Sequence, residues 1–459
     1  MDMTEGPLFG KIVRYAIPIG LTGLLQIAFH AADMVVIGRF ASHRSMAGIG
    51  AIGEISWLLV CVVVGISTGS NVVVAQMFGA NDRYGLRRTV HTSLAFALVS
   101  GFFLMAAGQA MLATALHWMK VPDEIFPLSL RYLRICFCGL PFSMISNFSL
   151  SVLRGVGDSR RPLYFLLASG VLNLLLNILL VAGFHMDVGG VAVATVFSQM
   201  LTTFLCIRAL TGECGPARLI LKHIRFYPAE LKRILWIGVP SGLQYACYAL
   251  ANTIIQSAIN PLGTAAIAGT TAAMVLEMGL HTWASAVYQT VMTFVGQNYG
   301  AGKYRRAARS IVLCLALVMI SLAVAGWLTV WHGKFLLGVI NRTPEVIENG
   351  MIRVRINLSV YFLLGAMDIT SGGLRGLGRS VIPMVVTLFG ACALRVLWVF
   401  TAFRADPTLP TLVAAFPLSW LCVATVNGAV LCLVCRRLIG NNANVFPAPV
   451  KNRQRGDIL

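Results

Sequence analysis

Four carboxylates stand inside the long apolar runs of this chain, and they are the side chains best suited to chemistry there. They are Asp33, Glu54, Glu277 and Asp368. The run around Asp33 extends from residue 15 to residue 38, and about 20 apolar residues are enough for a helix to cross a bilayer. A carboxylate at that depth costs about 3 kcal/mol or more unless it is protonated or paired. Each of the four therefore needs a reason to be there, and Asp33 is either a member of a structural ion pair or a working acid.

Asp33 has polar neighbours at a matching depth in two later runs. At a rise of about 1.5 Å per residue, Asn177 and Thr195 fall near the same level as Asp33. Asn173 precedes Asn177 by one helical turn and shares its helix face. A carboxylate, two amides and a hydroxyl form a cluster of oxygen atoms suited to a shared proton or to a hard cation such as Na⁺. We predict that these four residues bind a proton or a cation.

The alternative is that Asp33 only stabilises packing, through a hydrogen bond to Asn177 or to His30. The second half of the chain argues against this role. In the internal repeat described below, the positions of Asp33, Asn173 and Asn177 are taken by Ile255, Leu394 and Trp398. A duplicated fold that needed the cluster only for packing would not be expected to break its symmetry with a charge.

The other three acids are weaker candidates, for a substrate site or a second proton site. Glu277 falls at a depth comparable to that of Arg395 and could pair with it. Asp368 precedes Arg375 in the inner half of its run, where it could meet substrate or protons from the cytoplasm. Glu54 is close enough to the outer surface to be solvated.

The composition shows the class of protein in which these acidic residues stand. The chain is 57% hydrophobic and 12% charged, with a mean hydropathy of +0.78, whereas an ordinary soluble protein is about 25% charged. The apolar runs are too long for outer-membrane strands, so the bilayer must be crossed by helices that satisfy their own backbone groups. We expect an all-α integral membrane protein, and the first run is too long for a cleaved signal peptide.

We predict twelve transmembrane spans and a division of the chain near its middle. The longest polar stretch, 211–230, is interpreted as a cytoplasmic linker between a six-helix bundle at 1–210 and another at 231–440, and 441–459 as a cytoplasmic tail. The spans lie near 14–38, 47–77, 89–116, 127–153, 162–184, 190–210, 231–258, 265–297, 308–332, 347–374, 381–403 and 411–435.

The two halves repeat at an offset of 221 to 222 residues. Ala16-Ile-Pro-Ile-Gly20 matches Gly238-Val-Pro-Ser-Gly242, Val74-Ala-Gln-Met-Phe-Gly-Ala80 matches Val295-Gly-Gln-Asn-Tyr-Gly-Ala301, and Leu153-Arg-Gly-Val-Gly-Asp-Ser159 matches Leu374-Arg-Gly-Leu-Gly-Arg-Ser380. Because each half holds six spans, the copies have the same orientation and are related by an axis along the membrane normal. The repeat predicts two pseudo-twofold-related bundles around a central cleft, an architecture typical of alternating-access transport.

The net charge of +19 would suggest nucleic acid as the partner of a soluble protein, but most basic residues here stand in short loops on one side of the spans. That bias marks cytoplasmic loops, so both termini are expected in the cytoplasm and no nucleic acid is expected as a partner. The arginine of the repeated Leu-Arg-Gly-x-Gly-x-Ser motif is expected at the level of the lipid phosphates, in a structural turn or a gating contact.

Motifs of enzymes are missing from the sequence or are explained otherwise. Gly48-Ile-Gly-Ala-Ile-Gly53 fits a dinucleotide fingerprint letter for letter, but it opens a membrane helix and follows no strand, so close helix packing explains it better. We find no nucleophile elbow, no phosphate-binding lysine loop and no paired-histidine zinc motif. The sequence predicts no enzyme and no cofactor.

Several segments together resemble the multidrug and toxic compound extrusion (MATE) family, over roughly residues 8 to 440. They are the run ending in Ala-Asp33-Met-Val-Val-Ile-Gly-Arg39, the Leu153-Arg-Gly-Val-Gly-Asp-Ser motif followed by Pro162, and Gly296-Gln-Asn-Tyr-Gly-Ala-Gly302. The resemblance implies antiport, in which H⁺ or Na⁺ enters and an amphipathic, often cationic, compound leaves. It also implies a cation site at Asp33, Asn173, Asn177 and Thr195, and a first helix that bends at Pro18.

The chain departs from the pattern of that family at two places. Many prokaryotic relatives have an acid at the position of Asn177, so this site carries one negative charge fewer. A second group of relatives has a glutamate in the seventh span, whereas residues 244–252 contain none. A coupling site in the second half therefore depends on Asp368 and Glu277 alone.

These observations predict a monomeric exporter driven by H⁺ or Na⁺, in the plasma (inner) membrane, that acts on a small amphipathic molecule among membrane lipids. Binding of the cation at Asp33 would bend the first helix at Pro18 and shrink the amino-terminal pocket.

Two alternative functions remain. One is a flippase for a lipid or a lipid-linked saccharide, which would need a more cationic cavity. The other is a membrane-embedded lipid-modifying enzyme that uses buried acids as general acid and base.

Overall fold

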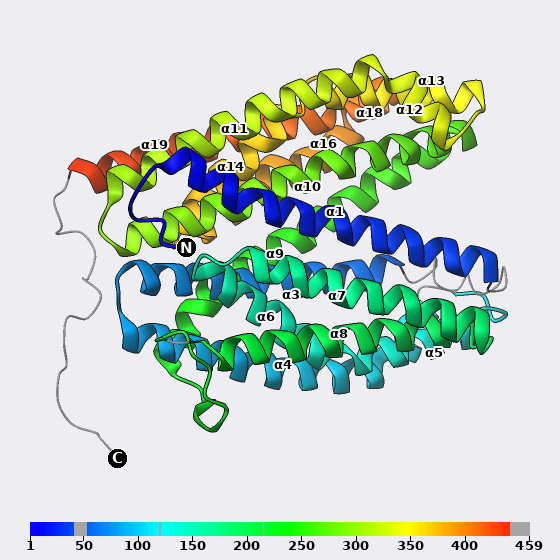
Figure 1. Ribbon diagram of the computed structural model, residues 1–459. Helices are drawn as coiled ribbons and strands as arrows, with labels where there is room; N and C mark the ends of the chain where they lie inside the picture. Colours follow the sequence, from blue (N-terminus) through cyan, green and yellow to red (C-terminus); the bar gives the residue numbers. More distant parts are fainter. Residues whose placement is uncertain (41–52, 119–120, 214, 441–459) are drawn as a thin grey trace.

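The computed structural model describes residues 1–40, 53–118, 121–213 and 215–440, and in these ranges the regular structure is entirely helical (Figure 1). The predicted all-α fold is therefore confirmed. The helices lie roughly parallel to one another and form two bundles, one above the other in the view of Figure 1.

Within its described residues, the first half of the chain supplies eight helical segments. They are α1 (Leu8–Phe40), α3 (Gly53–Gly79), α4 (Arg83–Trp118), α5 (Phe126–Cys138), α6 (Leu140–Gly155), α7 (Arg160–Asn177), the π-helix η1 (Ile178–Gly183) and α8 (Asp187–Thr211).

The second half contains more breaks. Its helices are α9 (Pro228–Ile259), η3 (Asn260–Leu262), α10 (Thr264–Gly300), α11 (Tyr304–Trp331), α12 (Gly333–Ile340), α13 (Pro344–Arg353), η4 (Val354–Leu358), α14 (Phe362–Gly376), α15 (Val381–Thr387), η5 (Leu388–Ala393), α16 (Leu394–Phe400), α17 (Ala402–Ala405), α18 (Leu409–Val413) and α19 (Ala415–Gly440). The connection between the halves runs from residue 212 to residue 227 and includes the short η2 (Leu221–His223).

The number of membrane-crossing helices differs from the prediction of twelve. Within the described ranges, nine helices are long and apolar enough to cross a membrane. Two bent pairs, α5 with α6 and α13–η4 with α14, raise the number to eleven if each pair is one span, with a bend of 47° in both. The remaining predicted span is α10, which has 37 residues but does not pass the same test. It packs against α1, α3, α11, α13 and α14, so it needs less apolar surface than a helix that faces lipid.

The ends of the helices nearest Met1 form what we call the basic face of the molecule. It comprises residues 1–7, the turns at 80–82, 156–159, 301–303 and 377–380, and the helix ends beside them. Basic residues of these helix ends give the face its name: Lys11, Arg83, Arg87, Arg88, Arg160, Arg161, Arg305, Arg306 and Arg309. Glycines let the two halves approach closely near this face. A Cβ atom on Gly69 of α3 would lie 2.1 Å from the carbonyl oxygen of Ile234 on α9, and one on Gly79 would lie 1.9 Å from that of Gln297 on α10.

The connection between the halves lies against α4 at the basic face. The amide of Ile220 donates to Nε2 of His91 at 3.1 Å, and the amide of Tyr227 donates to the hydroxyl of Thr92 at 3.2 Å. The segment predicted as a linker is therefore packed against a helix of the first half.

Candidate functional site

Asp33 on α1 lies against Asn177 on α7. The amide Nδ2 of Asn177 donates to Oδ1 of Asp33 at 2.6 Å and to Oδ1 of Asn173 at 3.1 Å. Asn177 is fully buried and Asn173 is 8% exposed. One amide group thus connects the carboxylate of one helix with the second asparagine of the other, and three of the four residues predicted for the cation site lie together.

The local structure of α7 changes at Asn177. The α-helix ends at this residue and continues as the π-helix η1. A π-helical turn inserts an extra residue into the turn and rotates the following side chains, and such turns are frequent at functional sites. Apolar residues of α1, η1 and α8 pack beside the cluster: Val36, Ile37, Val181 and Val191.

One polar atom of this cluster has no partner. Oδ1 of Asn177 is buried and accepts no hydrogen bond from any described residue. A buried oxygen of this kind is costly to leave unsatisfied. It has the chemistry to accept a hydrogen bond from a protonated carboxyl group or to ligate a cation.

The other residues predicted for this site are placed differently. Thr195 lies on α8, where its hydroxyl donates to the carbonyl of Val191 in its own helix at 2.9 Å. The structure gives Thr195 no hydrogen bond to Asp33. Pro18 lies inside α1, which passes through it as one helix in this structure. Asp33 interacts with His30 electrostatically, whereas its hydrogen bond is to Asn177.

Glu277 on α10 pairs with Arg353 of α13, and the predicted pairing with Arg395 is wrong. Nε and Nη2 of Arg353 donate to the two oxygens of Glu277 at 2.9 and 2.8 Å, and Nδ2 of Asn357 donates to Oε1 at 2.8 Å. Arg395 instead donates to Oγ of Ser419 at 3.0 Å and to Oδ1 of Asn252 at 3.1 Å. A bidentate, largely buried pair is typical of a structural element between helices.

The sequence suggested that the arginine of the second Leu-Arg-Gly motif lies at the level of the lipid phosphates, and this prediction is wrong. Arg375 is 2% exposed, and it donates to the hydroxyl of Tyr288 and to Oε1 of Gln244 inside the second bundle. Asp368 lies near Arg375 and His281 and interacts with both electrostatically. The Leu-Arg-Gly spacing alone gave no sign that this guanidinium turns inward.

The fourth candidate acid, Glu54, stands at the start of α3, and its side chain lies outside the described residues.

The buried cluster of Arg375, Tyr288 and Gln244 was not predicted from the sequence. A signal was available in the depth of Gln244, which stands well inside an apolar run and needs a polar partner there.

Arg154, which matches Arg375 in the internal repeat, contacts the other half of the chain. Its Nη1 atom donates to Oε1 of Gln289 on α10 at 2.6 Å, and its backbone carbonyl accepts a hydrogen bond from the hydroxyl of Tyr15 at 2.7 Å. The two motif arginines therefore point into the protein, one between the halves and the other within the second half.

The same duplication appears in a comparison with protein families. The sequence model of the MatE family matches residues 18–179 and again residues 240–401, so the second match starts 222 residues after the first. Together the matches cover more than half of the chain. The chain belongs to the MatE family. As a MatE protein it is a multi-pass membrane transporter and not an enzyme.

Individual MatE relatives are similar to this chain over most of its length. The "Probable multidrug resistance protein YoeA" of Bacillus subtilis is 25% identical over 382 residues, which are 82% of each protein. The "FAD transporter" of Shewanella oneidensis is 22% identical over 400 residues, 84% of this chain and 86% of the relative. A crystal structure of a MATE protein in complex with MaL6 superposes with a TM-score of 0.90 at 18% identity, covering 96% of this chain and 99% of that one.

Proposed function

We propose that this transporter is a secondary antiporter that exports amphipathic, often cationic, organic compounds in exchange for H⁺ or Na⁺. The observation that carries the proposal is the cluster of Asp33, Asn177 and Asn173. It contains one carboxylate and one buried oxygen without a partner, and the matching positions of the second half are apolar. This asymmetry supports an ion site in the first bundle alone.

In the proposed cycle, the ion that binds at Asp33 changes the contact between α1 and α7. Neutralisation of the carboxylate weakens its hydrogen bond with Asn177, because hydrogen bonds to charged acceptors are the stronger ones. The first helix has a weak point at Pro18, which lacks a backbone donor. The hydroxyl of Thr22 donates to the carbonyl of Pro18 at 2.7 Å, and such bonds favour bending of a helix. A bend there would change the space available to substrate in the first bundle.

The proposal includes an orientation and a location. We place the basic face in the cytoplasm, because positively charged loops remain on that side, and the protein in the plasma (inner) membrane as a monomer among lipids. Residue Thr195 stays a candidate ligand that would join the site after a change of rotamer. Asp368 and Glu277 stay candidates for a second proton or substrate site, with Glu277 the weaker of the two because it is already paired with Arg353.

A second candidate is export of an anionic amphipathic compound. Arg375 and Arg395 are 2% and 3% exposed, and among the described residues their hydrogen bonds are to neutral groups only. Buried guanidinium groups of this kind suit a carboxylate or phosphate ligand. A relative named as an FAD transporter supports the same possibility. A flippase for a lipid-linked saccharide would need the same positive charge.

The experiment that tests the function uses the full chain in reconstituted vesicles. Efflux of a fluorescent organic cation and of a flavin is measured under a pH gradient, under a Na⁺ gradient at fixed pH, and after each gradient is dissipated with an ionophore. We expect one gradient to drive efflux of the organic cation and its dissipation to stop it. Efflux of the flavin but not of the cation would favour the second candidate, and efflux that ignores both gradients would contradict antiport.

A further inference from the structure

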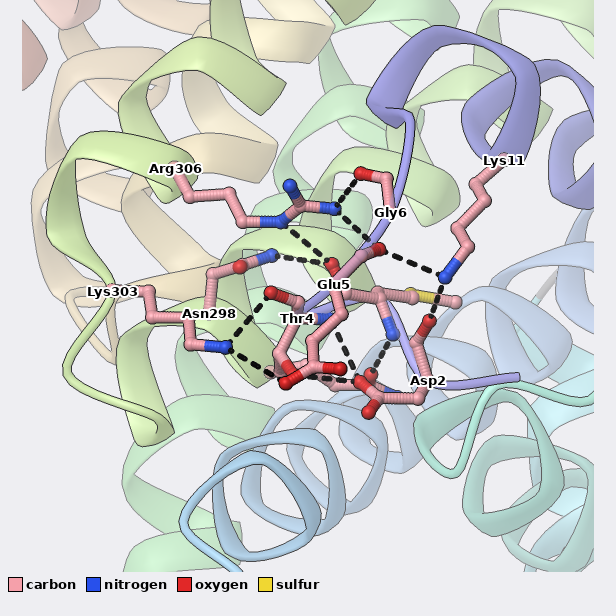
Figure 2. Close-up of polar contacts among 10 residues, drawn as sticks. Asp2, Thr4, Glu5, Gly6, Lys11, Asn298, Lys303 and Arg306 are labelled. Atoms are coloured by element: carbon pink, nitrogen blue, oxygen red, sulfur yellow. Dashed lines mark hydrogen bonds and ion pairs between the residues drawn. The ribbon is translucent and has the colours of Figure 1, made fainter.

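The first residues of the chain bind side chains of α10 and α11 at the basic face, as the close-up in Figure 2 shows. Met3 is fully buried, and its amide donates to Oε1 of Gln297 at 3.1 Å. Its carbonyl accepts from Nδ2 of Asn298 at 3.3 Å and from Nε of Arg306 at 3.1 Å. Both backbone groups of Met3 are therefore bound by side chains from the far end of α10 and the start of α11.

Two basic side chains of the second bundle bind the backbone carbonyl groups of the residues after Met3. Nη2 of Arg306 donates to the carbonyl oxygens of Glu5 and Gly6 at 2.7 and 2.8 Å. Nζ of Lys303 donates to the carbonyl of Thr4 at 3.0 Å and lies 3.6 Å from a carboxylate oxygen of Glu5. Arg306 alone thus binds the carbonyl groups of three residues of the segment, Met3, Glu5 and Gly6.

The segment is also ordered from within. Asp2 accepts hydrogen bonds from the amide and the hydroxyl of Thr4 at 2.7 and 2.8 Å, and Nζ of Lys11 donates to the carbonyls of Asp2 and Glu5 at 2.7 and 2.8 Å. Burial acts to raise the pKa of Asp2, but the bonds from Thr4 and the charges of Lys11 and Lys303 outweigh it, so its pKa lies below the ordinary value. The carboxylate therefore keeps its charge near neutral pH.

The same group of residues reaches the first bundle. The nitrogen of Met1 donates to the carbonyl of Gly157, in the turn between α6 and α7, at 3.2 Å. Nε2 of Gln297 donates to the carbonyl of Gly155 at 2.9 Å, so Gln297 binds the segment and the first bundle at once. A cavity of about 330 Å³ lies between Asp2, Thr4 and the turn that follows α3.

We propose that residues 2–6 act as a latch that keeps the two bundles together at the basic face and is released when that face opens. The latch and the direct contact share Gln297, so opening at Gly155 cannot leave the segment undisturbed. The contacts of the latch do not depend on the proposed function. Only its release does, because alternating access is the reason why this face would open during a transport cycle.

Hydrogen–deuterium exchange of the full chain in lipid nanodiscs tests the latch with the variant Arg306→Gln. This substitution removes the guanidinium that binds the carbonyls of Met3, Glu5 and Gly6. We expect deuterium uptake to rise several-fold in peptides covering residues 2–7. We expect a parallel rise at 71–79 and 292–300, the ends of α3 and α10 that meet at the basic face.

The matched control is Arg305→Gln, which removes the same charge one residue earlier. Arg305 is exposed, and among the described residues it has no bond to the segment, so uptake should equal that of the wild type. A second variant, Met3→Glu, places a charge at a fully buried position and should have the effect of Arg306→Gln, while Met3→Leu should not. These variants keep the test valid if Arg306→Gln does not fold.

Two results would overturn the latch. One is a wild-type segment 2–7 that exchanges as fast as an unprotected peptide. The other is release of the segment in Arg306→Gln or Met3→Glu with no change at 71–79 and 292–300. Hydrogen–deuterium exchange is measured without any transport assay. A failure of gradient-driven efflux would therefore contradict the antiport proposal and leave the exchange result for the latch unaffected.

Discussion

The contact between Asp33 and Asn177 shows what a sequence can and cannot say about single residues. Counting residues along two apolar runs gave both side chains a similar depth, and the structure joins them by a bond of 2.6 Å. The same counting suggested Arg395 as the partner of Glu277, but the partner is Arg353. Depth alone does not give the direction in which a side chain leaves its helix, and that direction depends on the packing of all neighbours.

The pair of Glu277 and Arg353 leads to a prediction about stability. Removal of one partner of a buried pair leaves an uncompensated charge, which costs about 3–5 kcal/mol. We expect Arg353→Ala, at a side chain that is 5% exposed, to lower the thermal unfolding midpoint of the detergent-purified protein by several degrees. The matched control is Arg355→Ala, an exposed arginine two residues later, which should leave the midpoint unchanged. Equal midpoints for the two variants would show that the pair contributes little.

Most helices could be predicted from apolar runs, and their irregularities could not. The bends of 47° between α5 and α6 and between η4 and α14, and the change to a π-helix after Asn177, depend on how each helix packs. The span at α10 was predicted from its apolar run, like the other spans. Its position among five other helices explains why polar residues such as Glu277 and Gln297 are accepted within it.

The close approach of α3 and α9 leads to a prediction for helix packing. A methyl group at Gly69 would overlap the backbone carbonyl of Ile234 at 2.1 Å, and backbone atoms cannot move aside as a side chain can. We expect Gly69→Ala to destabilise the protein by about 1–3 kcal/mol through overpacking. The control is Gly279→Ala on α10, where a Cβ atom meets nothing within 4 Å. There the change should be neutral or slightly stabilising. A thermal midpoint of Gly69→Ala at or above that of the control would contradict the close packing.

The duplication of the whole chain was visible in the sequence and is confirmed by the two family matches, which start 222 residues apart. Short motifs with a constant offset survive divergence because they form turns and close helix contacts. The sequence could not predict that the two bundles meet at the basic face, because this closure depends on contacts between segments that are distant in the sequence. Gln297 with Gly155 and Gln76 with Gly376, at 2.9 Å each, close the basic face in this structure. Such contacts have no signature in a local pattern.

The central claim is that one carboxylate in the first bundle couples ion entry to export. The most direct test is gradient-driven efflux by Asp33→Asn in reconstituted vesicles, with the substrate that the wild type exports. The control is Asp123→Asn, the same substitution at an exposed acid in the loop after α4. We predict that Asp33→Asn stays folded by thermal midpoint and loses gradient-driven efflux, whereas Asp123→Asn transports like the wild type. Wild-type rates in a folded Asp33→Asn protein would contradict the account.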